Sequence, residues 1–403
     1  MTTTPVMSAG GVDLTHGRLT WSPDGKVSIR TLDGHTAVAG DGIAAELASL
    51  LHGESASGTA LVARADHLVG VVHGVETGFG PDVDMANWNV VVDGRLIVKV
   101  IGILGHGDRA ARLVRVILRH APRAVPLLHG TIEVSTSAGP RVVATVTEFL
   151  PGSVDGWTWV VDEALDALEN GTRSTWPLEL GALVASVHGA LVSETAGEPA
   201  HESEITRSAL DELSVLLAED NDTAHRLRAR AEALEAALRA VPATTAPTFA
   251  VHGDLHVGQV LRDSSGAMRL IDFDGDPQSG IHSHRTDAAV DLAHLLVSLD
   301  LVGAVVAKRL GTDLPEILGW CDDARSQLLE GYREAARRLG VGFLLDEARL
   351  PGLEARRLIR EFTYARDFLP RWRYASDWAV THRFPAAPEI KDAPWTPPDS
   401  AMI

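Results

Sequence analysis

The spacing of apolar residues changes part-way along the chain, and this change most constrains the fold. Up to Pro151 they form short β-like runs separated by Gly and Asp-Gly turns, with a longer helical stretch at Arg109–His120. From Val160 to Phe368 the spacing is mostly helical, and a loop and hairpin interrupt it after Pro247. A β-rich part followed by a largely helical part predicts an α+β fold with two lobes.

We expect three parts within this fold: residues 1–80 as an N-terminal cap subdomain, residues 81–152 as a β-rich lobe, and residues 153–403 as a mainly helical lobe. The break at Gly78–Pro81 separates the first two parts, and Pro151-Gly152 ends the second. The cap contains one expected helix, Gly42–Leu51. The strands expected in the first two parts are Leu19–Trp21, Val27–Thr31, Leu61–Ala63, Leu68–His73, Asn89–Val92, Leu96–Ile101, Val125–Leu128, Gly130–Val134 and Arg141–Phe149.

Charge and cysteine content narrow the class of protein. The chain has 36 Lys and Arg against 54 Asp and Glu, a formal net charge of −18. This acidity argues against a nucleic-acid partner or an anionic membrane, because both require a basic surface. The single cysteine, Cys321, excludes an intrachain disulfide and favours a reducing compartment. The N-terminus has no signal-peptide pattern, and Ala288–Val306 has acidic residues at helical spacing, so we expect a core helix in a cytoplasmic protein.

The densest group of chemically capable residues lies at His252–Gln259 and Leu270–Asp274. The first segment reads His-Gly-Asp-Leu-His-Val-Gly-Gln, with a carboxylate at Asp254 and an amide five residues later at Gln259. A second carboxylate, Asp272, follows 13 residues beyond Gln259, across a predicted β-hairpin. Each piece alone is common in structural turns, whereas the combination at these intervals is rare by chance.

Phosphoryl transfer needs this set of groups. A carboxylate accepts the proton of the attacking hydroxyl, while an amide and an acidic group hold Mg²⁺ against the phosphates of ATP. We therefore predict Asp254 as the catalytic base and Gln259, Asp272 and Asp274 as magnesium ligands. The amide of Gln259 supplies a neutral oxygen suited to a hard cation, and alternate residues such as Asp272 and Asp274 share a face.

The cluster resembles the catalytic and metal-binding segments of the aminoglycoside phosphotransferase and protein-kinase-like superfamily. Its longer form, His-Gly-Asp-Leu-His-x-Gly-Gln-x-Leu, is similar to that of bacterial maltokinases and the related actinobacterial glucosamine kinases, where Gln replaces the usual Asn. The resemblance extends in order from about Asp84 to Arg373. It implies a bilobal protein-kinase-like fold in which residues 81–152 bind the nucleotide and residues 153–403 carry the catalytic loop and acceptor site.

The resemblance also implies how ATP is held. Lys99, in an apolar strand, corresponds to a lysine that grips the ATP phosphates, although alone it would be interpreted as a solvent-facing strand residue. Asn87 lies at the place of the loop that covers the phosphates. The segment Thr147–Gly152 resembles the hinge between lobes, where the backbone near Glu148 and Leu150 would bond the adenine edge.

The partner of the lysine departs from the family pattern. Kinase-like enzymes usually pair this lysine with a Glu on the next helix, but Arg109–His120 contains no acidic residue. Asp108, at the start of this helix, could substitute for the Glu, or the acid could come from elsewhere in the chain.

Smaller differences from the maltokinase sequence patterns indicate which sugar accepts the phosphoryl group. The acidic run Asp272–Pro277 and the segment Arg285–Leu292 differ from maltokinase patterns, and the cap is similar to that of glucosamine kinases. We therefore predict an ATP-dependent kinase that makes glucosamine 6-phosphate, because carboxylates would attract the protonated amine. The predicted acceptor-site residues are His256, Asp276, Asp287, Glu361 and Trp378.

Other interpretations stay open. Helix capping and loop anchoring would equally explain Asp287 and Asp291, and core packing would explain Trp378. Maltokinase activity giving maltose 1-phosphate and an aminoglycoside-type phosphotransferase are alternative functions. A nucleotide-binding pseudokinase is the non-enzymatic alternative, although intact Asp254 and Gln259 argue against it. We expect a monomer or homodimer.

Overall fold

The structure is a computed structural model that describes residues 8–52, 61–79, 87–197, 202–275, 285–387 and 395–397. The chain divides into two compact units, each with its own core. Unit 1 comprises Met1–Ser153 and Arg269–Ser283, and unit 2 comprises Val154–Met268 and His284–Ile403. The acidic segment after the hairpin therefore belongs to the same unit as the β-rich lobe, although more than a hundred residues separate them in sequence.

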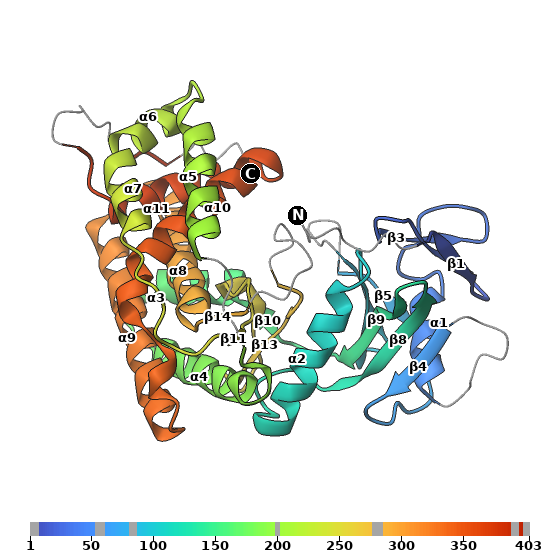
Figure 1. The fold of residues 1–403 in the computed structure, drawn as a ribbon. Helices are drawn as coiled ribbons and strands as arrows, with labels where there is room; N and C mark the ends of the chain where they lie inside the picture. Colours follow the sequence, from blue (N-terminus) through green and yellow to red (C-terminus); the bar gives the residue numbers. More distant parts are fainter. Residues whose placement is uncertain are drawn as a thin grey trace. The chain divides into compact units, whose positions relative to one another are not determined.

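Unit 1 is built on a six-stranded antiparallel sheet in the order β4-β8-β9-β7-β6-β5 (Figure 1). The strands are β4 (Leu61–Ala65), β5 (Glu76–Thr77), β6 (Trp88–Val92), β7 (Leu96–Val100), β8 (Leu128–Thr136) and β9 (Gly139–Glu148). A separate three-stranded sheet contains β1 (Gly10–Asp13), β2 (Gly17–Trp21) and β3 (Val27–Thr31), and the helical elements are α1 (Ile43–Ser49), the 3-10 turn η1 (Leu50–His52) and α2 (His106–His120). Residues of both sheets and of α1 share one apolar core.

The hairpin β6–β7 sets the place of Lys99. Asp93 and Gly94 both have positive φ, 52° and 62°, which is the geometry of a two-residue hairpin turn. In β7 the side chains of Leu96, Val98 and Val100 are buried, so the alternate Lys99 lies on the other face of the strand. The predicted hairpin and strand are confirmed.

Two predicted strands are wrong. Leu68–His73 contains no strand: Leu68 is 93% exposed, and the carbonyls of Gly70 and Val71 accept hydrogen bonds from the Arg95 side chain. This apolar segment has no neighbouring strand among the described residues with which it could pair. Val125–Leu128 is also not a strand of its own, because only its last residue enters β8.

Unit 2 is mainly helical. Its helices are α3 (Gly156–Asn170), α4 (Trp176–Thr195), α5 (Glu202–Leu217), α6 (Asp222–Ala229), α7 (Ala231–Arg239), α8 (Ala289–Leu310), α9 (Pro315–Arg338), α10 (Leu350–Asp367) and α11 (Arg373–Arg383). Short 3-10 turns are η2 (Val257–Gln259), η3 (Gly342–Leu344), η4 (Glu347–Arg349) and η5 (Pro370–Trp372). Its short strands are β10 (Val154–Asp155), β11 (Phe249–Ala250), β12 (Val260–Arg262) and β14 (Arg285–Thr286), while β13 (Met268–Leu270) crosses the boundary between the units.

The predicted hairpin after the catalytic-loop motif is present. It consists of β12 and β13, and the Asp263 amide donates to the carbonyl of Ala267 at 3.0 Å to close the turn. Strands β10 and β12 pair antiparallel. This pairing fixes β12, the first strand of the hairpin, against the segment that directly precedes α3. The hairpin therefore has a fixed register relative to the loop that precedes it.

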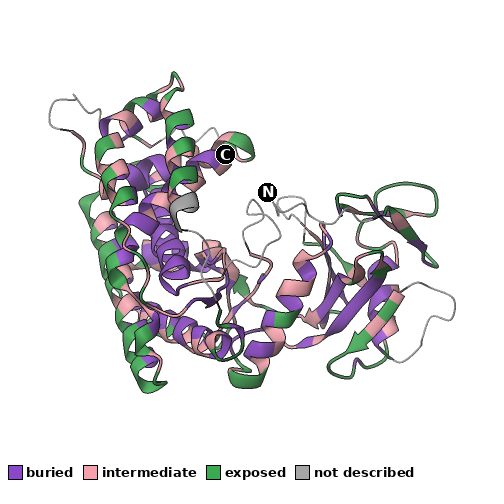
Figure 2. Cartoon of the chain, viewed as in Figure 1, coloured by how far each residue is buried: buried purple, intermediate pink, exposed green. Residues whose placement is uncertain are grey.

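Helix α8 is the core helix of unit 2. Both α8 and α4 are long and apolar enough to cross a membrane, but 94% of the most apolar window of α8 and 56% of that of α4 are buried within the protein (Figure 2). The buried carboxylate of Asp300 in α8 is neutralised by Arg325 at 3.0 Å and by Arg383 at 2.5 Å. The prediction of a core helix at Ala288–Val306 is confirmed.

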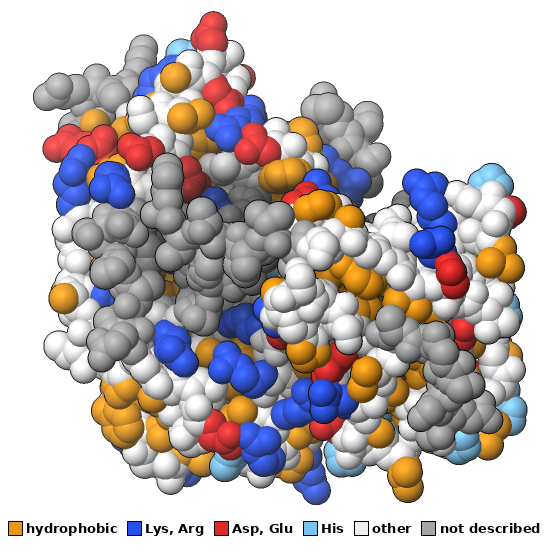
Figure 3. All heavy atoms as spheres, turned by 45° about the vertical axis from the view of Figure 1, so that its right-hand side comes forward, with side chains coloured by type: hydrophobic (Ala, Val, Ile, Leu, Met, Phe, Trp, Pro, Cys, Tyr) orange, Lys and Arg blue, Asp and Glu red, His pale blue; other side chains and the backbone are white. Residues whose placement is uncertain are grey.

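Surface charges of both signs are mixed. Acidic and basic side chains lie among one another on the face drawn in Figure 3. Many form exposed pairs, such as Arg333–Glu347 at 2.6 Å and Arg239–Glu235 at 3.1 Å. Because water and salt screen such pairs, each stabilises the fold by only about 0–1 kcal/mol.

Candidate active site

Lys99 is the centre of a charged cluster in unit 1. Its Nζ lies 2.6 Å from Asp272 Oδ1 and 2.7 Å from Asp274 Oδ2, and its side chain is only 17% exposed. Burial alone would lower the pKa of Lys99, but the two carboxylates raise it above its ordinary value. Lys99 therefore keeps its positive charge at physiological pH.

The segment that carries the two aspartates is held in an unusual conformation. Asp272 has a φ of 65°, in the left-handed region that non-glycine residues rarely adopt. Phe273 is buried, and its carbonyl accepts a hydrogen bond from Arg109 Nη1 on α2. These constraints point Asp272 and Asp274 toward the same lysine, as the sequence predicts for residues that share a face. Asp276 lies outside the described residues.

Asp274 has a free acceptor atom. Its Oδ2 accepts from Lys99 and from Asn87 Nδ2, the latter at 3.1 Å. Its Oδ1 is buried and has no hydrogen-bond partner within the described part of the chain. A desolvated carboxylate oxygen without a donor is costly unless a cation binds it, so Asp274 fits the donor set of a magnesium site. Asn87 also accepts from the Gly102 amide at 2.9 Å, so it supports Asp274 from the loop before β6.

The acid that pairs with Lys99 comes from elsewhere in the chain, not from the helix start. Asp108 accepts from the Val142 amide at 2.7 Å and lies 3.6 Å from Arg141. Burial raises the pKa of Asp108 above its ordinary value. Asp108 thus ties α2 to β9, while Asp272 and Asp274 neutralise the lysine.

The predicted hinge offers a free amide. The Glu148 amide donates to the Leu127 carbonyl, and its carboxylate accepts from the Leu127 amide at 3.3 Å. The Leu150 carbonyl accepts from Ser153 Oγ at 2.7 Å, whereas the Leu150 amide has no partner among the described residues. An unpaired backbone donor just after a strand is suited to an acceptor nitrogen of a planar base.

The catalytic-loop motif in unit 2 is anchored to α8. The amides of His252 and Gly253 donate to the carboxylate of Asp291 at 2.7 and 2.8 Å, and the Val257 amide donates to Ser298 Oγ at 3.0 Å. Burial alone would raise the pKa of Asp291, but His188 at 3.1 Å and the loop amides lower it well below its ordinary value. The loop-anchoring interpretation of Asp291 is confirmed.

Helix α3 packs closely against this loop because Gly156 at the helix start and Gly258 in the loop have no side chains. A Cβ atom at Gly156 would lie 1.9 Å from the Val257 carbonyl oxygen, and one at Gly258 would lie 2.5 Å from Trp157 Nε1. The Trp157 ring packs on His256, with ring centroids 5.8 Å apart. The loop backbone therefore depends on glycine at both positions.

Asp254 is held by an arginine that sequence reasoning missed. Its Oδ1 lies 2.9 Å from Arg357 Nη1 on α10, and Arg357 Nη2 lies 2.6 Å from Glu361 Oε1. These three side chains are 21%, 10% and 19% exposed. The i,i+4 spacing of Arg357 and Glu361 predicts their own pairing, but nothing in the sequence connects Arg357 with a loop about a hundred residues away.

His256 and Gln259 complete the loop. His256 Nδ1 accepts from the Gly258 amide at 3.1 Å, and its Nε2 lies 3.3 Å from Gln259 Nε2. Burial lowers the pKa of His256 below its ordinary value. A neutral His256 ring that accepts at Nδ1 carries its proton on Nε2, so the contact places the Gln259 side-chain amide beside a ring donor.

Two predicted acceptor-site residues lie in the core instead. Asp287 is fully buried, accepts from the Ala289 amide at 3.0 Å and pairs with the buried Arg349 at 3.0 Å. Trp378 is also fully buried, and its Nε1 donates to Asp313 Oδ1 at 2.8 Å. Neither side chain can contact a sugar in this structure, so the prediction is corrected for both: helix capping and core packing account for them.

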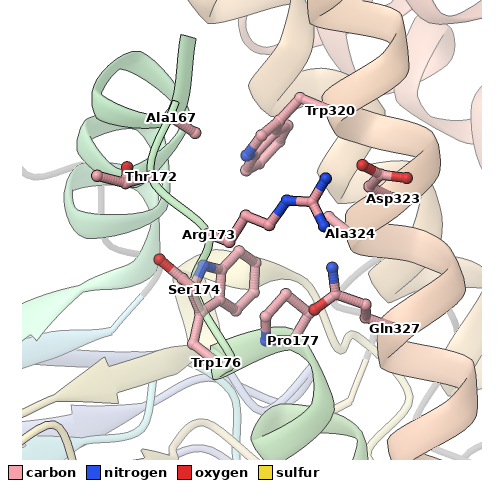
Figure 4. A pocket seen from close by; sticks show the side chains of 10 residues that line it. All are labelled: Ala167, Thr172, Arg173, Ser174, Trp176, Pro177, Trp320, Asp323, Ala324 and Gln327. Atoms are coloured by element: carbon pink, nitrogen blue, oxygen red, sulfur yellow. The ribbon is translucent and has the colours of Figure 1, made fainter. Parts of the chain in front are cut away.

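A hollow of about 250 Å³ in unit 2 lies between the α3–α4 loop and α9 (Figure 4). Figure 4 shows Arg173 extending from that loop toward α9, beside Trp320. The hollow is lined by none of the predicted site residues. Its lining residues are Ala167, Thr172, Arg173, Ser174, Trp176, Pro177, Trp320, Asp323, Ala324 and Gln327.

Comparison with known proteins shows the family of the chain. Residues 77–337 match the phosphotransferase enzyme family. The chain belongs to this family. One relative of this phosphotransferase, the glucosamine kinase of Streptacidiphilus jiangxiensis, is 31% identical over 322 residues, which are 75% of this chain and 72% of the relative. Another, the glucosamine kinase of Mycolicibacterium smegmatis, is 32% identical over 399 residues, 92% of this chain and 96% of the relative.

Solved structures extend the comparison to the fold. A glucosamine kinase in complex with glucosamine, ADP and inorganic phosphate has a TM-score of 0.78 and 28% identity to the phosphotransferase, covering 93% of this chain and 94% of that one. A second glucosamine kinase crystal form has a TM-score of 0.76 and 27% identity, covering 95% and 96% of the two chains. The predicted α+β, kinase-like fold of this superfamily is confirmed.

Proposed function

We propose that this phosphotransferase is a glucosamine kinase that transfers the γ-phosphoryl group of ATP to the 6-hydroxyl of glucosamine. The observation that carries the proposal is the similar structure with glucosamine, ADP and inorganic phosphate bound, matched over nearly the whole chain. Two curated relatives with the same name support it. The chain itself retains a carboxylate, an amide and a lysine with two aspartates, which phosphoryl transfer requires.

Asp254 is the proposed catalytic base. It lies in an anchored loop, and it is 21% exposed, so a hydroxyl can approach it. As a carboxylate it accepts the proton of the attacking hydroxyl, or orients that hydroxyl for attack on the γ-phosphorus. The anchors from α8 hold the loop backbone during the step.

Lys99 and the hinge are proposed to hold the nucleotide. The ammonium of Lys99 stays charged and can offset the negative charge of the phosphates. The Leu150 amide can donate a hydrogen bond to the edge of the adenine ring. The backbone of Glu148, at the end of β9, is proposed to bond the same edge of the ring. Asn87 is proposed to support the phosphate side of this site through Asp274.

Mg²⁺ is the proposed metal. In unit 1, Asp274 Oδ1 and an Asp272 oxygen would hold it, and the buried, unpaired Asp274 Oδ1 is the observation that fits a cation. In unit 2, Gln259 stays the ligand predicted from the loop motif. When bound, the metal neutralises charge that develops on the transferred phosphoryl group. Lys99 would then share the two aspartates with the ion rather than neutralise them alone.

The acceptor amine is proposed to lie near the carboxylates of unit 2. Glu361 is 19% exposed, and in the described contacts it shares the guanidinium of Arg357 with Asp254. An ammonium group is attracted to such a surplus of negative charge. His256, at the same loop, supplies a neutral ring with an adjoining Trp157 face for the sugar. We further propose that the enzyme acts in the cytoplasm.

A panel of acceptors tests the proposal. The purified protein is incubated with Mg-ATP and glucosamine, glucose, maltose or an aminoglycoside, and ADP release is measured. Glucosamine should be turned over fastest, and ³¹P NMR of the product should show a phosphomonoester at the 6-position. Turnover of maltose or of the aminoglycoside in preference to glucosamine would exclude the proposed acceptor, and nucleotide binding without turnover of any acceptor would indicate a pseudokinase.

A further inference from the structure

Arg357 joins two carboxylates that come from different elements. Its Nη1 lies 2.9 Å from Asp254 Oδ1 in the catalytic loop, and its Nη2 lies 2.6 Å from Glu361 Oε1 one turn further along α10. The arginine side chain is 10% exposed, so both contacts are largely shielded from water. Within the described structure Asp254 Oδ2 has no hydrogen-bond partner. One oxygen of the carboxylate is therefore occupied, and the other is available.

Among the residues that the structure describes, Arg357 is the cation in direct contact with Asp254. His256 and His294 lie near this pair, and both interact electrostatically with Arg357. His294 Nδ1 lies 3.5 Å from Arg357 Nη1. The remaining titratable or charged groups that act on these two histidines are His252, Asp291, Arg356 and Glu361.

The chemical form of the cation matters here. A guanidinium presents separate N–H donors in a fixed plane, so it can contact two carboxylates and fix the direction of each. A lysine ammonium is a flexible point charge that can neutralise the pair but cannot fix both directions. The use of both terminal nitrogens by Arg357 is thus a constraint on orientation as well as on charge.

We propose that Arg357 is a positioning residue that holds Asp254 through Oδ1 and presents Oδ2 to the acceptor hydroxyl. This inference rests on the proposed role of Asp254 as the base. Arg357 also ties that base to Glu361, so the acceptor site and the reacting carboxylate are fixed by the same side chain. If the base shifts by about 1 Å, it is no longer aligned with the acceptor hydroxyl. Such a shift lowers kcat, whereas the affinity for the nucleotide changes little.

The test compares three variants on one helix. Arg357→Gln removes the charge, Arg357→Lys keeps the charge without the fork, and Arg360→Gln is the matched control. Arg360 also lies on α10 and forms an ion pair of its own, 3.3 Å from Glu212, but no contact with Asp254 is described. Melting temperature, kcat, the KM for ATP and the KM for the acceptor are measured for each, with the acceptor that the wild type turns over.

For Arg357→Gln we expect kcat to fall about 100-fold with the KM for ATP unchanged. Arg357→Lys should recover part of this loss, and Arg360→Gln should keep wild-type kcat. Wild-type kcat in folded Arg357→Gln, or equal losses in the Arg357 and Arg360 variants, would overturn the inference. If Arg357→Gln does not fold, Arg357→Lys decides: reduced kcat at an unchanged melting temperature supports it, and wild-type kcat overturns it. A wild type that prefers another sugar refutes the proposed acceptor, while the variant comparison still tests Arg357.

Discussion

The two units hold their candidate carboxylates with different cations. In unit 1 the single ammonium of Lys99 contacts Asp272 and Asp274, which lie two positions apart in one short segment. In unit 2 the fork of Arg357 contacts Asp254 and Glu361, which come from a loop and a helix. In each cluster one cation contacts two carboxylates, but the lysine contacts residues that are close in sequence and the arginine joins two separate elements.

This difference indicates how readily the carboxylates of each cluster can exchange their cation for another partner. A compact ammonium can be shared, so Asp272 and Asp274 can contact a metal while Lys99 turns toward phosphates. A planar guanidinium with both nitrogens engaged fixes direction, so Asp254 keeps its orientation. Exchangeable pairing in unit 1 and fixed pairing in unit 2 suit a cation site and a base, respectively.

The largest effect should come from the unit 2 carboxylate itself. Asp254→Asn keeps the shape of the side chain but cannot accept a proton, so kcat should fall about 1,000-fold. Single-turnover ADP release measures it. Asp263→Asn, in the hairpin turn, is the control and should keep wild-type turnover, because the Asp263 carboxylate accepts hydrogen bonds from Ser265 and Ala267 within that turn. Wild-type turnover in Asp254→Asn would show that Asp254 is not the catalytic base.

Lys99 should show the next largest effect. Lys99→Met removes the ammonium that contacts Asp272 and Asp274, and kcat/KM for ATP should fall about 100-fold. Lys99→Arg should be impaired as well, because a guanidinium is too large for the shielded space between two oxygens at 2.6 and 2.7 Å. Lys308→Met, which among the described contacts loses the one with the Tyr374 ring, is the control. Full activity in Lys99→Arg would show that charge alone matters in unit 1.

The anchor of the unit 2 loop should be visible in stability. Asp291→Asn leaves His188 and the loop amides without a charged acceptor, so the free energy of unfolding should drop by about 3 kcal/mol. Because the folded-state pKa of Asp291 is lowered, its contribution is present above the unfolded pKa of about 3.9 and is lost as the pH falls through the folded-state pKa. The difference in melting temperature between wild type and variant should therefore shrink below about pH 4. A difference that does not change with pH would contradict this.

The smallest effect tests the corrected acceptor site. Trp378→Phe loses the hydrogen bond to Asp313 in the core, so the free energy of unfolding should fall by about 1 kcal/mol. Since Trp378 is fully buried, the KM for glucosamine should not change. A raised KM with unchanged stability would return Trp378 to the sugar site.

Local patterns were sufficient for much of the fold and site. The Asp-Gly turn and the alternation around Lys99 predict the β6–β7 hairpin, because both depend on neighbours in sequence. The loop motif predicts Asp254 and Gln259 in one anchored turn. Long-range partners were not accessible in this way. The contacts of Lys99 with Asp272 and of Arg357 with Asp254 join residues more than a hundred positions apart, and no periodicity records them.

Burial was the other limit. Aromatic and acidic residues near the C-terminus look alike in sequence whether they face a ligand or the core. Trp378 and Asp287 satisfy their polar atoms inside unit 2, which only the packing of the helices reveals. In the run Leu68–His73, Leu68 and Val71 are exposed whereas Val69 is buried, so a series of apolar residues does not by itself predict a strand.

The left-handed backbone at Asp272 limits which amino acids can stand there. Only glycine adopts a φ of 65° freely, and Asn and Asp tolerate it better than other residues. Chance substitution at this position therefore rarely yields a relaxed chain, and an alanine variant would combine loss of the carboxylate with backbone strain. Asparagine is the informative replacement, and a natural sequence with leucine or valine here would be expected to have rebuilt the whole turn.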